Sequence, residues 1–156
     1  MPTTEAQIKT DYPLPVYNYR VEIGTTAVAF SEVSGLELSY ETIIYKESRL
    51  STTDSPNTIY MPGMLKPVYI NLKKGYVKGK NMQALYKWID SIRLNVIEKK
   101  NITIHLCDET GTSVVRWVVS NAFPIKLSAP NFNASSDDVA IDSMELMASN
   151  VRIAED

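Results

Sequence analysis

The sequence predicts a mainly β fold, an antiparallel β-sandwich or barrel with one lateral α-helix. About eight segments alternate apolar and polar residues with the period of two that marks a half-buried strand. One segment alone has the spacing of an amphipathic helix, and the strands do not alternate with helices as they do around a parallel sheet. The 156 residues, 44% of them hydrophobic, suffice for one well-filled core. We therefore expect a single domain over 1–156.

The first fifteen residues are polar and then punctuated by proline (MPTTEAQIKTDYPLP). Proline fixes φ and donates no backbone hydrogen bond, so this composition predicts an extended arm over 1–15, outside the core. Such arms are often mobile until a partner orders them.

Three strands are predicted between Val16 and Ile44. In the first, the apolar face consists of Tyr17, Tyr19, Val21 and Ile23. A turn signal at Gly24 precedes a short strand over 27–33, and a second turn at Ser34–Gly35 precedes the third strand. In that third strand, one face carries Leu36, Leu38 and Tyr40, and the other carries Glu37, Ser39 and Glu41.

Residues 47–64 (ESRLSTTDSPNTIYMPGM) break the alternation. Ser, Thr, Asp, Asn, Pro and Gly dominate this segment, which predicts a long irregular or hairpin-like loop. Loops longer than about 12–15 residues are uncommon in compact domains and are usually functional or disordered. Four large apolar residues indicate that this loop contacts something apolar: Leu50, Ile59, Tyr60 and Met61.

A strand and the single helix follow the loop. The strand over 66–74 points Val68, Ile70 and Leu72 inward. The helix is expected within residues 80–100, where the i, i+3, i+4 spacing of apolar residues predicts one buried face. That face consists of Met82, Leu85, Trp88, Ile89, Ile92 and Val96. We expect the helix to cap one open edge or end of the β structure.

Two more strands are predicted over 101–107 and 114–120, with a turn at 108–111 between them. Their alternation places one set of apolar side chains toward the core: Ile102, Ile104, Leu106, Val115, Trp117 and Val119.

The last part of the chain carries two irregularities. Pro124 predicts a corner between two strands at 121–124, because proline fixes its own φ and pushes the residue before it toward extended geometry. After the corner, the next strand is expected to point Ile125 and Leu127 inward. In the element over 137–149 the apolar phase slips near Asp142–Ser143, which predicts a β-bulge there.

The charge and composition exclude several classes of function. Sixteen basic and eighteen acidic residues are mixed along the chain, so no basic stripe predicts nucleic-acid binding by sequence-specific readout. No apolar run approaches the roughly 20 residues needed to span a bilayer, and the absence of a signal-peptide pattern predicts synthesis in the cytoplasm. Cys107 is the only cysteine, so an intrachain disulfide is impossible.

Three patterns in the sequence are candidates for a chemical site. His105 and Cys107 lie two apart on a predicted strand, but a zinc site needs three or four ligands and a nucleophilic cysteine needs an oriented base. The segment GYVKGK at 75–80 departs from the phosphate-loop spacing. Carboxylates on several strands could include a glycosidase pair, yet solvent-facing carboxylates are the usual alternative. We therefore predict no catalytic residue, no cofactor and no metal.

The ordered segments resemble the tail-tube (inner tube) protein family of contractile-tailed phages and phage-tail-like contractile injection systems. The resemblance covers residues 16–148 and is carried by YNYRVEIG, AFSEVSGLE, ETIIYKE, MPGMLKPVYINLKKG, ALYKWID, RWVVSNAFPIKLSAP and DDVAIDSMEL. It implies a structural subunit without catalytic residues that forms hexameric rings. These rings stack into a hollow conduit inside a contractile sheath. The implied partners are further copies of the chain, the sheath protein, baseplate or spike components, and cargo in the lumen.

The resemblance also assigns candidate residues. The loop over 47–64 has the position of the inter-subunit loop with which tube subunits reach the adjoining ring, so its ring-stacking residues would be Leu50, Ile59, Tyr60 and Met61. Polar residues that alternate with the apolar ones would face the channel: Arg20, Glu22, Glu37, Ser39, Glu41, Asn71 and Lys73.

Two alternatives stay open. Ser48–Arg49 stand where the family often has glycine, and the ending ASNVRIAED lacks a common apolar end, so the chain could instead be a tube-initiating paralogue at the baseplate. The other alternative is a monomeric β-sandwich that binds carbohydrate, with Trp88, Tyr60 and Tyr69 exposed for stacking. A tube subunit would end in a phage tail or a released extracellular injection particle.

Overall fold

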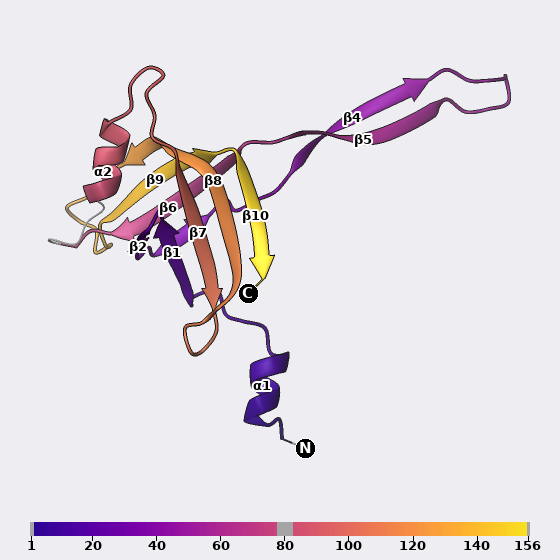
Figure 1. Ribbon diagram of the computed structural model, residues 1–156. Helices are drawn as coiled ribbons and strands as arrows, with labels where there is room; N and C mark the ends of the chain where they lie inside the picture. The colour runs from indigo at the N-terminus through magenta and orange to yellow at the C-terminus, as the bar shows by residue number, and fades with distance from the viewer. Residues whose placement is uncertain (1, 78–82, 156) are drawn as a thin grey trace.

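A computed structural model describes residues 2–77 and 83–155 of the chain. Its strands all pair in antiparallel fashion, which confirms the predicted mainly β class (Figure 1). The elements in chain order are α1 (Glu5–Asp11), β1 (Tyr19–Ile23), β2 (Thr26–Val28), β3 (Glu32–Ser34), β4 (Tyr40–Glu47), β5 (Asn57–Leu65), β6 (Val68–Gly75), α2 (Gln83–Asp90), β7 (Lys100–Cys107), β8 (Ser113–Ser128), β9 (Ile141–Ala148) and β10 (Asn150–Glu155).

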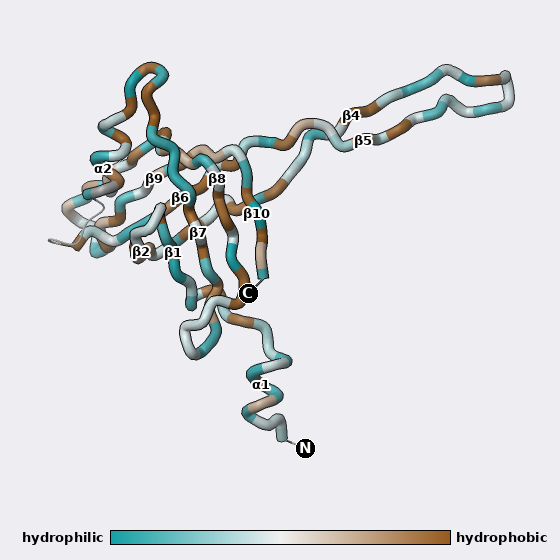
Figure 2. The backbone as a smooth tube through the Cα atoms, viewed as in Figure 1, coloured by the Kyte–Doolittle hydropathy of each residue, from teal (hydrophilic) through white to brown (hydrophobic). Residues whose placement is uncertain are grey.

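Strand β8 joins two sheets. Its first part pairs with β7 and β10, and its second part pairs with β9. We call the set β2-β1-β7-β8-β10 sheet A and the set β3-β6-β9-β8 sheet B. Apolar side chains from both sheets form a single core between them. Figure 2 shows the corresponding alternation of hydrophobic and hydrophilic residues along the strands.

The bend that takes β8 from one sheet to the other lies at the predicted corner. Asn121 has φ +56°, a left-handed conformation that asparagine tolerates better than most residues. Ser149, the residue between β9 and β10, contacts this bend: its backbone N–H and its hydroxyl both donate to the carbonyl of Ser120, at 3.2 and 3.1 Å. The corner is therefore a bend within one long strand, where the sequence predicted a break between two.

Two expectations near this corner are wrong. Ile125 is 44% exposed, and Leu127 is also exposed, because the register of β8 against β9 shifts between Pro124 and Lys126. The predicted bulge at Asp142–Ser143 is absent, since β9 pairs with β6 in unbroken register. Asp142 occupies an inward-facing position of β9 and is buried, so the row of inward residues continues without a change of phase.

The inward faces of the central strands are as predicted. Val68, Ile70, Leu72, Ile102, Ile104 and Val119 are buried, together with Val21 and Ile23 of β1. Leu106 and Trp117 are only partly buried. Tyr17 is exposed and precedes β1.

The turn at Ser34–Gly35 has a steric cause. Gly35 has φ +89°, and a Cβ atom at this position would lie 2.0 Å from the carbonyl oxygen of Tyr69. Two strand predictions around this turn are corrected. The expected strand over 27–33 divides into β2 and β3 on different sheets, and the third strand begins only at Tyr40.

Helix α2 is shorter than predicted. Leu85 and Trp88 pack in the core, and the Trp88 indole donates to the carbonyl of Glu98 at 2.6 Å. The helix ends at Asp90, after which Arg93 and Val96 form a short bridge around Asn95, whose φ is +59°. Of the predicted apolar face, Val96 is exposed and lies beyond the helix, and Met82 lies outside the described residues.

The arm over 1–15 contains helix α1, so the expectation of an extended arm is wrong for its middle part. Thr4 and Gln7 form a capping box, with hydrogen bonds of 2.9 and 3.2 Å between side chains and backbone. No residue of α1 is buried, and Figure 1 shows the helix outside the two sheets. Within the described residues, neither α1 nor α2 is long and apolar enough to cross a membrane.

Candidate assembly surfaces

Strands β4 and β5 form a hairpin that pairs with no other described strand and projects far from the two sheets (Figure 1). The segment predicted as a long loop over 47–64 is therefore the tip and the returning strand of this hairpin. A two-stranded ribbon is marginally stable in water by itself. An isolated hairpin of this length consequently needs a surface to pack on.

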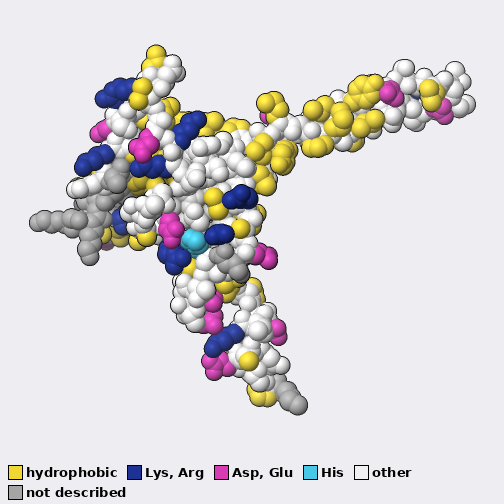
Figure 3. Space-filling view, in the orientation of Figure 1, with side chains coloured by type: hydrophobic (Ala, Val, Ile, Leu, Met, Phe, Trp, Pro, Cys, Tyr) yellow, Lys and Arg dark blue, Asp and Glu magenta, His cyan; other side chains and the backbone are white. Residues whose placement is uncertain are grey.

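Both sides of the hairpin carry exposed apolar pairs. On one side Ile43 lies opposite Met61 and Tyr45 lies opposite Ile59; on the other side Ile44 lies opposite Tyr60. All six side chains are exposed, and Figure 3 shows hydrophobic side chains along the projection. Contiguous exposed apolar surface of this kind marks an interaction site.

The structure separates the four predicted ring-stacking residues. Ile59 and Met61 share one side of β5, Tyr60 lies on the opposite side, and Leu50 lies in the tip at 97% exposure. The sequence reasoning missed Ile43, Ile44 and Tyr45 of β4. These three residues form the apolar run IIY in the sequence, but a strand inside a core can contain the same run, so the run does not identify an exposed surface.

The seven predicted channel residues do not share one surface. Arg20 and Glu22 lie on the outer face of sheet A, where Nε of Arg20 is 3.5 Å from Oε1 of Glu22. Asn71 and Lys73 lie on the outer face of sheet B, which points the opposite way from that of sheet A. The remaining three lie near the base of the hairpin: Glu37, Ser39 and Glu41.

The outer face of sheet B carries two polar rows that cross its strands. One row consists of Glu32, Lys73, Ser143 and Ser128, and the other consists of Ser34, Asn71, Glu145 and Lys126. Lys73 Nζ lies 3.3 Å from Glu32 Oε2 in the first row. Each row has one basic and one acidic residue, so this part of the face is hydrophilic and electrically balanced.

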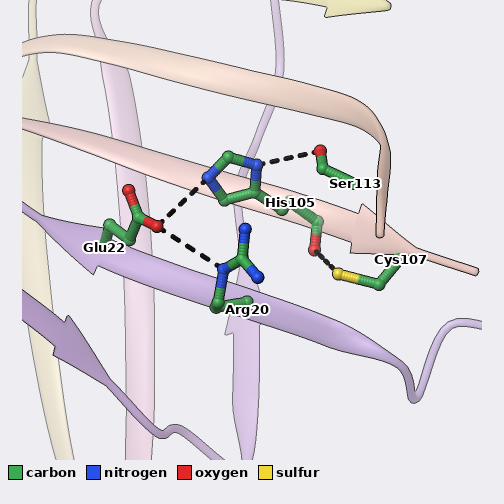
Figure 4. A network of polar contacts seen from close by, with 5 residues as sticks. All are labelled: Arg20, Glu22, His105, Cys107 and Ser113. Carbon is green, nitrogen blue, oxygen red and sulfur yellow. Dashed lines mark hydrogen bonds and ion pairs between the residues drawn. The ribbon is translucent and has the colours of Figure 1, made fainter. Parts of the chain in front are cut away.

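The outer face of sheet A holds the His105 cluster (Figure 4). His105 is buried, its Nδ1 lies 2.9 Å from the hydroxyl of Ser113, and its Nε2 lies 3.6 Å from Glu22 Oε1. The Cys107 thiol is buried and contacts the backbone carbonyl of His105 at 3.8 Å. The arrangement shows no contact between thiol and imidazole, and the described residues hold no cluster of three or more metal-ligating side chains.

Two long strand edges are open among the described strands. Strand β10 pairs only with β8, and the second half of β8 pairs only with β9. Unpaired edges present free N–H and C=O groups that another chain can extend. Each sheet therefore has an unpaired edge among the strands that the structure describes, in addition to the hairpin.

The aromatic platform of the carbohydrate alternative does not form. Trp88 is 3% exposed in the core, whereas Tyr60 is on the hairpin and Tyr69 is on the outer face of sheet B. Three residues on three separate surfaces cannot stack on one sugar.

Comparison with known proteins decides the family. The sequence profile of the family described as T4-like virus tail tube protein gp19 matches residues 15–152. The chain belongs to this tail tube family. Tail tube proteins are structural, and this membership confirms the prediction that the chain is not an enzyme. No curated protein sequence matches the chain.

Solved structures of tail tube proteins agree with this family. A chain of the PVC extracellular contractile injection system, from its sheath-tube complex in the extended state, is 41% identical with a TM-score of 0.88, over 99% of this chain and 100% of that one. A chain of the tube-terminating cap of the anti-feeding prophage is 40% identical with a TM-score of 0.85, over 100% of both. A chain from the PVC sheath/tube terminator is 41% identical with a TM-score of 0.83, over 93% of this chain and 99% of that one.

Proposed function

We propose that this protein is a subunit of the inner tube of a contractile injection particle. In this role it forms hexameric rings that stack into a hollow conduit inside the sheath. The observation that carries the proposal is the free β4–β5 hairpin, with apolar pairs on both sides, in a chain of the tail tube family. A segment with this much exposed apolar surface suits permanent contact with neighbouring subunits.

The open edges support closure into a ring. When a subunit joins head to tail with its neighbour, edge strands such as β10 and the second half of β8 acquire partners, and the aggregation hazard of an open sheet is removed. The hairpin then reaches a subunit of the adjoining ring. Contact with the sheath, and a final place in an extracellular particle, are supported by the PVC sheath-tube and sheath/tube-terminator assemblies from which two 41% identical structures come.

The outer face of sheet B is proposed as the channel wall. Its two balanced polar rows suit a wet conduit that cargo must pass, and β5 leads within a few residues into β6, so the hairpin leaves from this sheet. Of the predicted channel residues, this assigns Asn71 and Lys73 to the lumen. Arg20 and Glu22 then face away from it.

A terminating position at the tube end is the second candidate. A cap chain is 40% identical to this chain and a tube chain is 41% identical, so identity favours neither position. The two positions differ in how many faces of a ring bind another ring. A repeating tube subunit stacks on both faces, whereas a terminator stacks on one.

Electron microscopy and sedimentation of the purified protein test both candidates. Rings that stack into tubes of variable length are expected for a repeating subunit, and single or paired rings for a terminator. A 17.5 kDa monomer at every concentration, also after addition of tube fragments as nuclei, would overturn the proposal.

A further inference from the structure

A pocket of about 500 Å³ beside α2 ends on a buried carboxylate. Aromatic side chains from three parts of the chain contribute to its walls: Tyr76 after β6, Tyr86 of α2 and Phe132 of the segment before β9. Asp142, the second residue of β9, lies at the pocket with 7% of its surface exposed. The volume falls within the range of about 300–1,000 Å³ in which proteins bind small groups.

In the part of the chain that the structure describes, Asp142 forms no ion pair. The hydroxyl of Tyr86 donates a hydrogen bond to Oδ2, and among the described residues no other donor and no lysine or arginine pairs with this carboxylate. Lys74 lies directly opposite on β6 and on the same face of the sheet, so a positive charge is near Asp142 without forming an ion pair with it. A buried carboxylate with one neutral partner is costly, because desolvation is not repaid by an opposite charge.

The surroundings of Asp142 fit a cation. Burial, followed by the hydrogen bond to Asp142, raises the pKa of Tyr86 to about 12, so this hydroxyl stays a donor at neutral pH. The remaining carboxylate lone pairs can accept from an ammonium or guanidinium group. Aromatic faces attract the same cations, and aliphatic walls suit the stem of a long basic side chain. A bare metal ion fits less well, since one carboxylate supplies too few oxygen ligands.

We propose that this pocket accepts a lysine or arginine side chain of a partner protein. Its charged group pairs with Asp142, and its stem packs against the aromatic walls. The inference goes beyond the proposed assembly of the chain with itself and does not rest on it. Loss of cation binding would overturn the pocket proposal and leave ring formation untouched. Failure to form rings would overturn the proposed function and leave the pocket untouched.

Small mimics of the two side chains test the pocket. Thermal unfolding of the full chain is measured with n-butylammonium, butylguanidinium and, as the uncharged control, n-butanol. A ligand that binds only the folded state stabilises it by RT ln(1 + c/Kd) at ligand concentration c, so the melting temperature rises with ligand concentration. Both cations are expected to raise it with the logarithmic concentration dependence of a single site, and n-butanol is not. Equal effects of cation and alcohol would overturn the proposal.

Three variants connect the effect to the pocket. Asp142→Asn keeps an acceptor for Tyr86 without the charge, and it is expected to abolish the response to both cations. Phe132→Ala, at a highly exposed position that tolerates truncation, is expected to weaken binding about 2- to 5-fold, the loss of one cation–π contact. Lys74→Gln removes the positive charge opposite Asp142 and should preserve or strengthen the response. A cation response that survives Asp142→Asn contradicts the assignment. If Asp142→Asn does not fold, a response unchanged by Phe132→Ala contradicts it.

Discussion

Single atoms decide several local features of this protein, and Gly35 is the clearest case. A Cβ atom at Gly35 would collide with the Tyr69 carbonyl oxygen, and the φ of Gly35 lies in the region that glycine alone adopts freely. The sequence predicted a turn at this position from the residue type alone. It could not reveal the contact with Tyr69, because that residue lies far away in the chain and meets Gly35 only through the fold.

Replacement of Gly35 measures this contact. Gly35→Ala is expected to lower the free energy of unfolding by more than the roughly 1–3 kcal/mol that a strained backbone costs, because the new Cβ also clashes with Tyr69. Gly111→Ala is the matched control, since Gly111 has a similar φ of +83° and no atom within 4 Å of the added Cβ. Urea unfolding of both variants gives the difference. Equal losses would show that the contact with Tyr69 contributes nothing.

Burial of individual residues was predictable wherever strand register is regular. Val68, Ile70 and Leu72 alternate without interruption and are buried as predicted. The predicted burial of Ile125 and Leu127 was wrong because the pairing of β8 with β9 shifts beside Pro124. A register shift depends on the partner strand, which the local sequence does not identify. Asp142 was read as the site of an irregularity, since a carboxylate in an apolar row is rare enough to resemble a change of phase.

Among the elements, the β4–β5 hairpin shows what periodicity cannot distinguish. Alternation identifies a strand with a preferred face, but it does not say whether that face packs on the same chain or on another. The position of the excursion was therefore predictable, and so was its need for an apolar contact. The contribution of β4 was missed, because ETIIYKE has the pattern of an ordinary strand. Helix α1 was not predicted, because no residue of it is buried and its sequence therefore lacks an apolar face with helical spacing. Its capping box is a local signal only.

Polar substitutions on one side of the hairpin test its proposed role in stacking. The double variant Ile59→Ser with Met61→Ser is expected to leave unfolding within about 0.5 kcal/mol of the original, because these side chains are exposed in the subunit. Ring stacking should be lost, since each of the two apolar pairs on that side loses one member. Electron micrographs then show single rings in place of tubes.

The control for this experiment is Lys46→Ser together with Thr58→Ser, a facing pair on the opposite side of the same hairpin. It alters the ribbon to a similar extent without removing an apolar side chain, and its tubes should form normally. Tubes of ordinary length from the Ile59 and Met61 variant would show that this side of the hairpin is not a stacking contact.

For the molecule as a whole, the sequence predicted the fold class well and the arrangement of surfaces poorly. Alternating strands and one core helix lead directly to two packed antiparallel sheets. Which outer face a polar residue occupies depends on the strand order, and the bend within β8 sets that order. The seven channel candidates consequently fell on two opposite faces and on the hairpin base.

Surface labelling of assembled tubes decides between the two faces. Ser143→Cys places a thiol on the outer face of sheet B, and Thr103→Cys places one on the outer face of sheet A. The only natural cysteine is buried, which keeps the background low. Maleimide-coupled gold is expected to decorate Thr103→Cys tubes along their length and Ser143→Cys tubes only at their ends. The reverse pattern would assign the channel to sheet A.

The hairpin also bears on how such a protein can diverge. No residue of β4 is buried in the subunit, so the subunit's own folding places little constraint on the side chains of this strand. If the hairpin binds a neighbouring subunit as proposed, selection on these side chains comes from that neighbour. Two related tube proteins in one genome can thus avoid co-assembly through paired changes in β4 and in the surface that binds it. The two sheets of the domain need not change.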